Sequence, residues 1–138
     1  MTQFSELSNT EWSGNAELWL DPLGNEAEWS ECTARIGPTA LEYTWQHDGK
    51  PQSGKLVLVD DGADFTDTFH SSSVMHFTRV PHGRAPLDLR GSYGPEGDWG
   101  WRITLSVRAP SGELVLQMTN ITPWGEEVRA VRMVMSRK

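Results

Sequence analysis

Residues 99–108 read Trp-Gly-Trp-Arg-Ile-Thr-Leu-Ser-Val-Arg, and this stretch decides the fold. Large apolar side chains occupy every second position from Trp99 to Val107, with glycine or polar side chains between them. A period of two is typical of a β-strand that buries one face. The turn-forming sequence Ala-Pro-Ser-Gly follows at 109–112, and a second apolar-rich stretch covers 114–121. The pattern predicts two antiparallel strands joined by a short turn.

The same alternation extends through most of the chain, and no convincing helical period interrupts it. Clusters of Gly, Pro, Asp and Asn, such as residues 21–25 and 37–38, separate the strand-like stretches. Connections this short make antiparallel hairpins and not crossovers. The predicted strands, about ten in number, are residues 12–20, 26–36, 41–47, 53–59, 65–70, 74–80, 87–93, 99–108, 114–121 and 128–135.

A sequential meander of about ten strands has to curl, and closing it removes the exposed edges. A sandwich would need longer Greek-key connections. We therefore predict one all-β domain over residues 1–138, a closed antiparallel up-and-down β-barrel. Residues 1–10 form a lead-in that caps it, with Ser5 or Thr2 as the candidate helix cap.

Two segments of the sequence indicate that the predicted barrel holds a cavity. Residues 81–86 are the longest break in the pattern and a candidate lid over a barrel mouth. Strand 26–36 mixes polar and apolar side chains on one face, including Glu28 and Cys32. This mixture indicates either a partly wet interior or a β-bulge.

Cysteine usage and hydropathy bear on the compartment. Cys32 is the only cysteine of the chain, so an internal disulfide is excluded. No N-terminal apolar run is present, and no stretch approaches the ~18 apolar residues of a membrane helix. We expect a cytoplasmic protein that does not span a membrane.

Charge is distributed unevenly. The net charge of −7 disfavours nucleic acid as a partner, because phosphates repel an acidic protein. Residues 1–70 carry 13 acidic and 3 basic side chains, whereas residues 71–138 carry 6 and 9. If the barrel closes between its first and last strands, Glu17 and its neighbours meet the late arginines across the seam. The alternative is an anion pocket lined by arginine.

Aromatic side chains are the strongest candidates for a binding site. Tyr43, Trp45 and His47 share one strand face, as do Trp99 and Trp101. Such rings either fill the core or form a pocket wall that stacks a planar or apolar ligand. The predicted ligand-binding residues are Tyr43, Trp45, His47, Phe65, Phe69, Trp99, Trp101 and Arg102.

Motifs for metal binding or catalysis do not rise above background. The serines at 71–73, with His70, His76 and Asp67, belong to one local segment, whereas catalytic triads usually combine distant segments. The aspartates at 60, 61, 64 and 67 lack the spacing of a calcium loop, and the histidines and Cys32 lack zinc spacing. Glycines at 94, 97 and 100 indicate a hairpin and not a phosphate loop, since no helix follows. We predict no metal, no cofactor and no catalytic residue.

The first strand carries a family signature. Thr10-Glu11-Trp12-Ser13-Gly14, with an arginine in the last strand, resembles the calycin superfamily, which includes lipocalins, fatty-acid-binding proteins and nitrobindin-like haem proteins. The chain is most similar to bacterial lipocalin-like domains of unknown function, whose first strand reads close to Gly-x-Trp-x-Gly; here Thr10 stands where the first Gly is usual. The resemblance implies that Trp12 closes one barrel end and that Arg129 or Arg132 packs over it as a cation–π pair.

The resemblance also implies a ligand cavity. The favoured hypothesis is a carrier or sensor of a small apolar or aromatic molecule, acting as a monomer or homodimer. The first alternative is a small barrel enzyme of the decarboxylase, cyclase or isomerase type that uses Tyr43, His47, Glu28 or Arg102. Fatty-acid-binding proteins hold a carboxylate with interior Arg and Tyr, and the candidates here are Arg102, Arg132, Tyr43 and Tyr93. The second alternative is haem bound through His70 or His76, since the late histidine of nitrobindin-like proteins is absent.

Overall fold

The computed structural model describes residues 3–69, 71–81, 83–92 and 98–138, without the side chains of 71 and 72. In this part of the chain a 3-10 helix, η1 (Phe4–Leu7), precedes ten strands. These are β1 (Thr10–Trp19), β2 (Ala27–Ile36), β3 (Ala40–His47), β4 (Lys50–Val59), β5 (Gly62–Asp67), β6 (Ser71–Arg79), β7 (Leu87–Ser92), β8 (Gly100–Arg108), β9 (Glu113–Ile121) and β10 (Glu127–Arg137). Within the same residues no helix is long and apolar enough to cross a bilayer.

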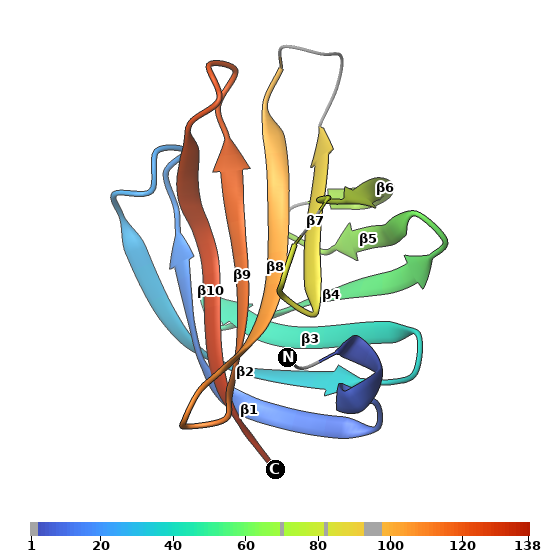
Figure 1. Cartoon of the computed structure of the whole chain (residues 1–138). Coiled ribbons are helices and arrows are strands. Elements are labelled where there is room, and N and C mark those ends of the chain that lie inside the picture. The colour runs from blue at the N-terminus through green and yellow to red at the C-terminus, as the bar shows by residue number, and fades with distance from the viewer. Residues whose placement is uncertain (1–2, 70, 82, 93–97) are drawn as a thin grey trace.

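The strands form one closed antiparallel barrel in which each strand pairs with its chain neighbours and β1 pairs with β10 (Figure 1). The prediction of a closed up-and-down barrel of ten strands is confirmed. The described residues do not include Thr2, His70, Tyr93, the predicted hairpin at 94–97 or His82 of the break at 81–86.

Strand β8 shows why the alternation produces a barrel wall. Trp101, Ile103 and Leu105 are each no more than 1% exposed, whereas the residues between them are half-buried on the outer face. Burial of one large apolar side chain contributes roughly 1.5–3 kcal/mol, and every strand adds such side chains to the same interior. The strand period of two therefore fixes which side chains face the core.

Strand β4 begins earlier than expected, at Lys50 and not at Ser53. The β3–β4 turn consists of Asp48 and Gly49, both with positive φ, which is the two-residue hairpin whose twist matches that of its strands. Pro51 pairs with β3, but the register of β4 with β5 starts only at Gly54. Pro51 therefore occupies an edge position, where its missing N–H is tolerated.

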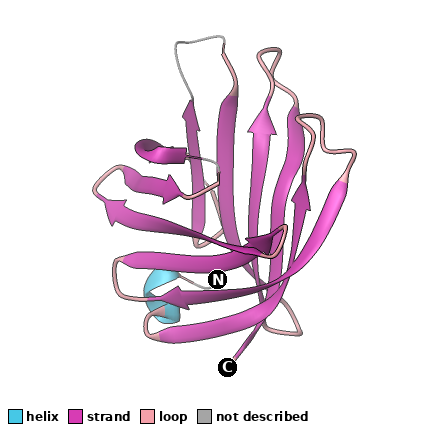
Figure 2. Ribbon diagram, turned by 180° about the vertical axis from the view of Figure 1, so that it is seen from behind, coloured by secondary structure: helices cyan, strands magenta, loops and turns pink. Residues whose placement is uncertain are grey.

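An up-and-down barrel places alternate connections at opposite ends. The connections that follow β1, β3, β5, β7 and β9 define one end, which we call the mouth. The connections that follow β2, β4, β6 and β8 lie at the other end, together with η1 (Figure 2). Residues 81–86 join β6 to β7 and so belong to this second end. They therefore do not lie over the end that we call the mouth.

The end opposite the mouth is closed by apolar packing. Phe4 and Leu7 of η1 are buried in the same cluster as Trp12. The Trp12 indole donates a 2.8 Å hydrogen bond to Thr10 Oγ1, and that hydroxyl donates to the Leu7 carbonyl. The helix follows Gln3 and has no side-chain cap, so the predicted capping by Ser5 is wrong; Thr2 lies outside the described residues.

The interior changes character along β2. This strand pairs with β1 without a register shift, from Thr10 opposite Ile36 to Trp19 opposite Ala27, so the bulge alternative is excluded. On its inner face Cys32 is buried, whereas Glu28, near the mouth, is half-buried. The inner face of β2 is therefore apolar toward the closed end and more polar toward the mouth.

Candidate functional site

A cavity of about 550 Å3 lies at the mouth of the barrel. This volume falls within the roughly 300–1,000 Å3 of small-molecule pockets. It is lined by Trp19, Leu20, Asp21, Pro22, Phe69, Asp98, Trp99, Trp101, Asn120 and Ala130.

Aromatic rings from separate hairpins form most of the apolar wall of this mouth cavity. Trp101 comes from the inner face of β8 and is fully buried, so it forms part of the floor. Phe69 follows β5 and is 42% exposed, as expected for a rim residue. Trp99 precedes β8 and contacts Trp124 of the β9–β10 turn edge-to-face, with 6.2 Å between ring centroids. The cavity therefore offers several aromatic rings to an apolar guest.

A second layer of residues lies behind Phe69. Its ring is 5.2 Å from that of Trp45 and 4.9 Å from that of His47, both in tilted or edge-on geometry. His47 Nδ1 lies 3.0 Å from Glu28 Oε2, and the backbone N–H of Asp48 donates to the other oxygen of Glu28. When the imidazole is neutral, a proton on Nδ1 leaves Nε2 as the acceptor. A carboxylate-oriented histidine thus adjoins the cavity.

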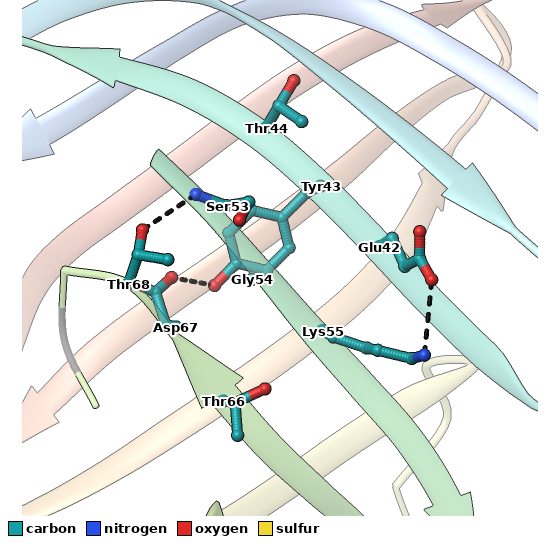
Figure 3. A pocket seen from close by; sticks show the side chains of 9 residues that line it. All are labelled: Glu42, Tyr43, Thr44, Ser53, Gly54, Lys55, Thr66, Asp67 and Thr68. Carbon is teal, nitrogen blue, oxygen red and sulfur yellow. Dashed lines mark hydrogen bonds and ion pairs between the residues drawn. The ribbon is translucent and has the colours of Figure 1, made fainter. Parts of the chain in front are cut away.

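Another cavity, of about 530 Å3, lies along β3, β4 and β5 (Figure 3). Figure 3 shows Tyr43 reaching across Gly54 toward Asp67, to which its hydroxyl donates a hydrogen bond. Four more of the lining residues are engaged within the protein. Lys55 pairs with Glu42 at 3.4 Å, and the Ser53 N–H donates to Thr68 Oγ1 at 3.0 Å.

The electrostatics of Tyr43 argue against a catalytic role for this side chain in the cavity along β3, β4 and β5. Burial, and then the neighbouring Asp67 carboxylate, raise the pKa of Tyr43 well above its ordinary value of 10.0. The phenol therefore remains protonated, and its O–H donates a hydrogen bond to the Asp67 carboxylate. We interpret the Tyr43, Gly54 and Asp67 row as a cross-strand clip in which an aromatic ring covers a glycine.

The predicted ligand residues therefore separate into groups. Phe69, Trp99 and Trp101 line the mouth cavity, and Trp45 and His47 adjoin it. The remaining aromatic pair, Tyr43 and Phe65, lies outside this lining. Tyr43 belongs to the clip, and Phe65 stacks on Phe77 with 5.6 Å between ring centroids.

Arg102 lies on the outer surface, which corrects the prediction that it lines the interior. Since Trp101 and Ile103 point inward, the strand period directs the residue between them outward. Its guanidinium pairs with Asp88 at 2.7 Å and with Glu127 at 3.0 Å. These contacts, Asp88 foremost, raise its pKa above the ordinary value, so the side chain is a permanent cation in a surface ion-pair network.

The predicted cation–π pair at Trp12 is also corrected. Because β1 and β10 are antiparallel, Trp12 lies opposite Arg137, and Arg132 lies opposite Glu17 on the outer face. Arg129 belongs to the mouth end of β10 and stacks on Trp19, with 4.8 Å from Cζ to the ring centroid. The seam itself is as expected, with acidic and basic strands side by side.

His76 faces outward and is held by two carboxylates, since Nδ1 lies 2.9 Å from Asp64 and Nε2 3.1 Å from Asp61. It is therefore not directed toward an interior haem, and the residues do not fit that alternative through His76. Among the described residues no group of three or more His, Cys, Asp or Glu side chains could hold a metal ion.

Several lining residues were not anticipated. Trp19 ends β1, and Leu20, Asp21 and Pro22 follow it in the β1–β2 connection. Asp98 precedes β8, and Asn120 lies near the end of β9, opposite Trp101. The sequence does contain one indication of Trp19 as a lining residue: Leu18 and Trp19 are consecutive apolar residues, and they break the period of two at the end of a strand. Comparison of the sequence with protein-family models gives no match, and no curated protein matches it.

Proposed function

We propose that this chain is a calycin-type barrel that binds a small apolar or aromatic molecule in its mouth cavity. The observation that carries the proposal is the cavity of about 550 Å3 walled by Trp19, Phe69, Trp99 and Trp101. The closed barrel, and the buried Trp12 that packs beside η1, support the calycin assignment.

The architecture suits a carrier or sensor. Because η1 and Trp12 fill one end, we expect a ligand to enter at the mouth. A planar guest of drug-fragment size fits the volume, and burial of its apolar surface contributes about 25 cal/mol per Å2. Aromatic stacking adds roughly 0.5–1.5 kcal/mol for each ring pair.

The test uses N-phenyl-1-naphthylamine, a neutral apolar probe whose fluorescence rises in a dry pocket. We expect saturable binding by the wild-type protein and a loss of at least about fivefold in Trp99→Ala, which removes about 1 kcal/mol or more of ring contact. Trp29→Ala is the matched control, because Trp29 is 66% exposed on β2 and does not line the cavity. Equal loss in both variants, or no binding by the wild type, would refute the proposal.

The pair of His47 and Glu28 favours a second candidate function, a proton-transfer enzyme. His47 Nε2 would accept a proton from a bound carbon acid while Glu28 holds the other ring nitrogen at 3.0 Å. The probe is 2-tetralone in D2O: the base removes an α-proton and returns a deuteron, which NMR follows. Exchange that is faster than buffer alone and is abolished in His47→Gln, but not in Arg102→Gln, would support the enzyme. Exchange at the buffer rate would exclude the enzyme and leave the carrier or sensor as the proposed function.

A further inference from the structure

The barrel interior contains no lysine or arginine. All twelve such residues of the chain are described; ten are exposed and two, Arg102 and Arg132, are half-buried. Arg102 is held on the outer face by Asp88 and Glu127. Arg132 lies between the buried Val131 and Met133 and therefore points outward. A ligand carboxylate inside this barrel would find no lysine or arginine to pair with.

The charged residues that line the mouth cavity are of the opposite sign. Among the described residues that line the cavity, the charged ones are Asp21 and Asp98. Asp21 remains ionised, because the backbone N–H groups of Glu26 and Asn25 donate to its Oδ1 and lower its pKa. Glu28, in the layer behind Phe69, adds a further carboxylate beside His47. Carboxylates therefore predominate around the cavity, whereas the Arg129 guanidinium at the same end is already bound to the Trp19 ring and the Gly24 carbonyl.

Aromatic rings provide the second half of a cation site. A cation within about 6 Å of a Trp or Phe face gains roughly two- to thirtyfold in affinity from the ring quadrupole. One ring of the cavity already takes part in such a contact, since Trp19 carries the Arg129 guanidinium at 4.8 Å. Trp99, half-buried, and Phe69, 42% exposed, stand at the rim and are accessible to the head group of a ligand.

We infer that the ligand class of the mouth cavity is an organic cation: an apolar or aromatic body bearing an ammonium group. The body packs on the aromatic floor, and the ammonium stays at the solvent-facing rim near Asp21 and Asp98, where it keeps part of its hydration. The inference rests on the proposed ligand-binding function and narrows it. The inference also disfavours a ligand with a fatty-acid-like carboxylate, because Asp21 and Asp98 would repel it.

The test compares three probes of nearly equal shape and different charge: 1-naphthylmethylamine, 1-naphthalenemethanol and 1-naphthoate. Isothermal titration at pH 7 should rank them amine, alcohol, carboxylate, with steps of about fivefold or more. The amine's affinity should fall as salt rises from about 20 to 500 mM, because screening shortens the Debye length, whereas the alcohol's should not.

Charge variants locate the effect. Asp98→Asn should lower the affinity for the amine about threefold, which is the effect expected when an exposed carboxylate about 6 Å from the ligand ammonium is removed. The affinity for the alcohol should not change. Asp60→Asn is the matched control, because it removes an equal charge from the β4–β5 turn at the closed end. If the alcohol or the carboxylate binds as tightly as the amine, the cation inference is overturned and the cavity function stands. If none of the three binds, both fail.

Discussion

The clip formed by Tyr43, Gly54 and Asp67 makes Gly54→Ala the most informative single substitution. A Cβ at position 54 would lie 2.2 Å from both Cζ and Oη of Tyr43. That ring cannot swing aside freely, because it is 1% exposed and its hydroxyl is bound to Asp67. The added methyl group therefore has to displace the ring and break the hydrogen bond.

The cost has two parts. Overpacking a filled interior costs roughly 1–3 kcal/mol, and losing a hydrogen bond to a charged group costs about 1.5–3 kcal/mol. The two overlap, since one ring movement causes both, so we expect a loss of about 2–5 kcal/mol. Against the ~5–15 kcal/mol that stabilises a typical domain, this is a large fraction.

Urea unfolding followed by tryptophan fluorescence measures the effect, and Gly37→Ala serves as the control. At position 37 the nearest atom to a new Cβ is the Ala40 carbonyl oxygen, at 3.8 Å, so the change should stay within about 0.5 kcal/mol. Because Tyr43→Phe releases the ring from Asp67, Gly54→Ala should cost about 1 kcal/mol less in that background. The clip is refuted if Gly54→Ala is as mild as Gly37→Ala.

Two further outcomes are expected. Asp64 and Asp61 raise the pKa of His76 above its ordinary 6.5, and His76 lowers that of Asp61 below 3.8. The ion pairs of His76 therefore stabilise the fold fully between pH 3.8 and pH 6.5, and this stabilisation is lost as the pH rises through the raised pKa of His76. The free energies of unfolding of the wild type and of His76→Gln should therefore converge at alkaline pH. A difference between them that widens at alkaline pH would contradict this expectation. Burial raises the pKa of Cys32 to about 12, so a thiol reagent should label it only in urea; rapid labelling of the folded protein would contradict its burial.

The sequence predicts the barrel well because the relevant signal is local. Alternation over residues 99–108 assigns the strand and its buried face without knowledge of its partners. The same rule should have placed Arg102 outside, because it cannot share a strand face with Trp101. That error came from assigning both residues to one pocket on the strength of side-chain chemistry alone.

The mouth cavity was only partly predictable, because it depends on which hairpins meet at one end. Aromatic content pointed to Phe69 and Trp99. Asp21 and Asp98, in contrast, are more than seventy positions apart and line one cavity only because the barrel brings their connections to the same end. The contact of Arg129 with Trp19 depends on the register of β1 against β10, which no local pattern reveals.

Closure between β1 and β10 has a consequence for how the chain acquires its structure during synthesis. Nine of the ten strand pairings join consecutive strands, so they can form as the nascent chain lengthens. The tenth has to wait for residues 127–137, and until then β1 and the most recently made strand expose unpaired backbone groups. A ribosome-bound or C-terminally truncated chain would therefore be open to pairing with a second copy, a hazard that the completed ring removes.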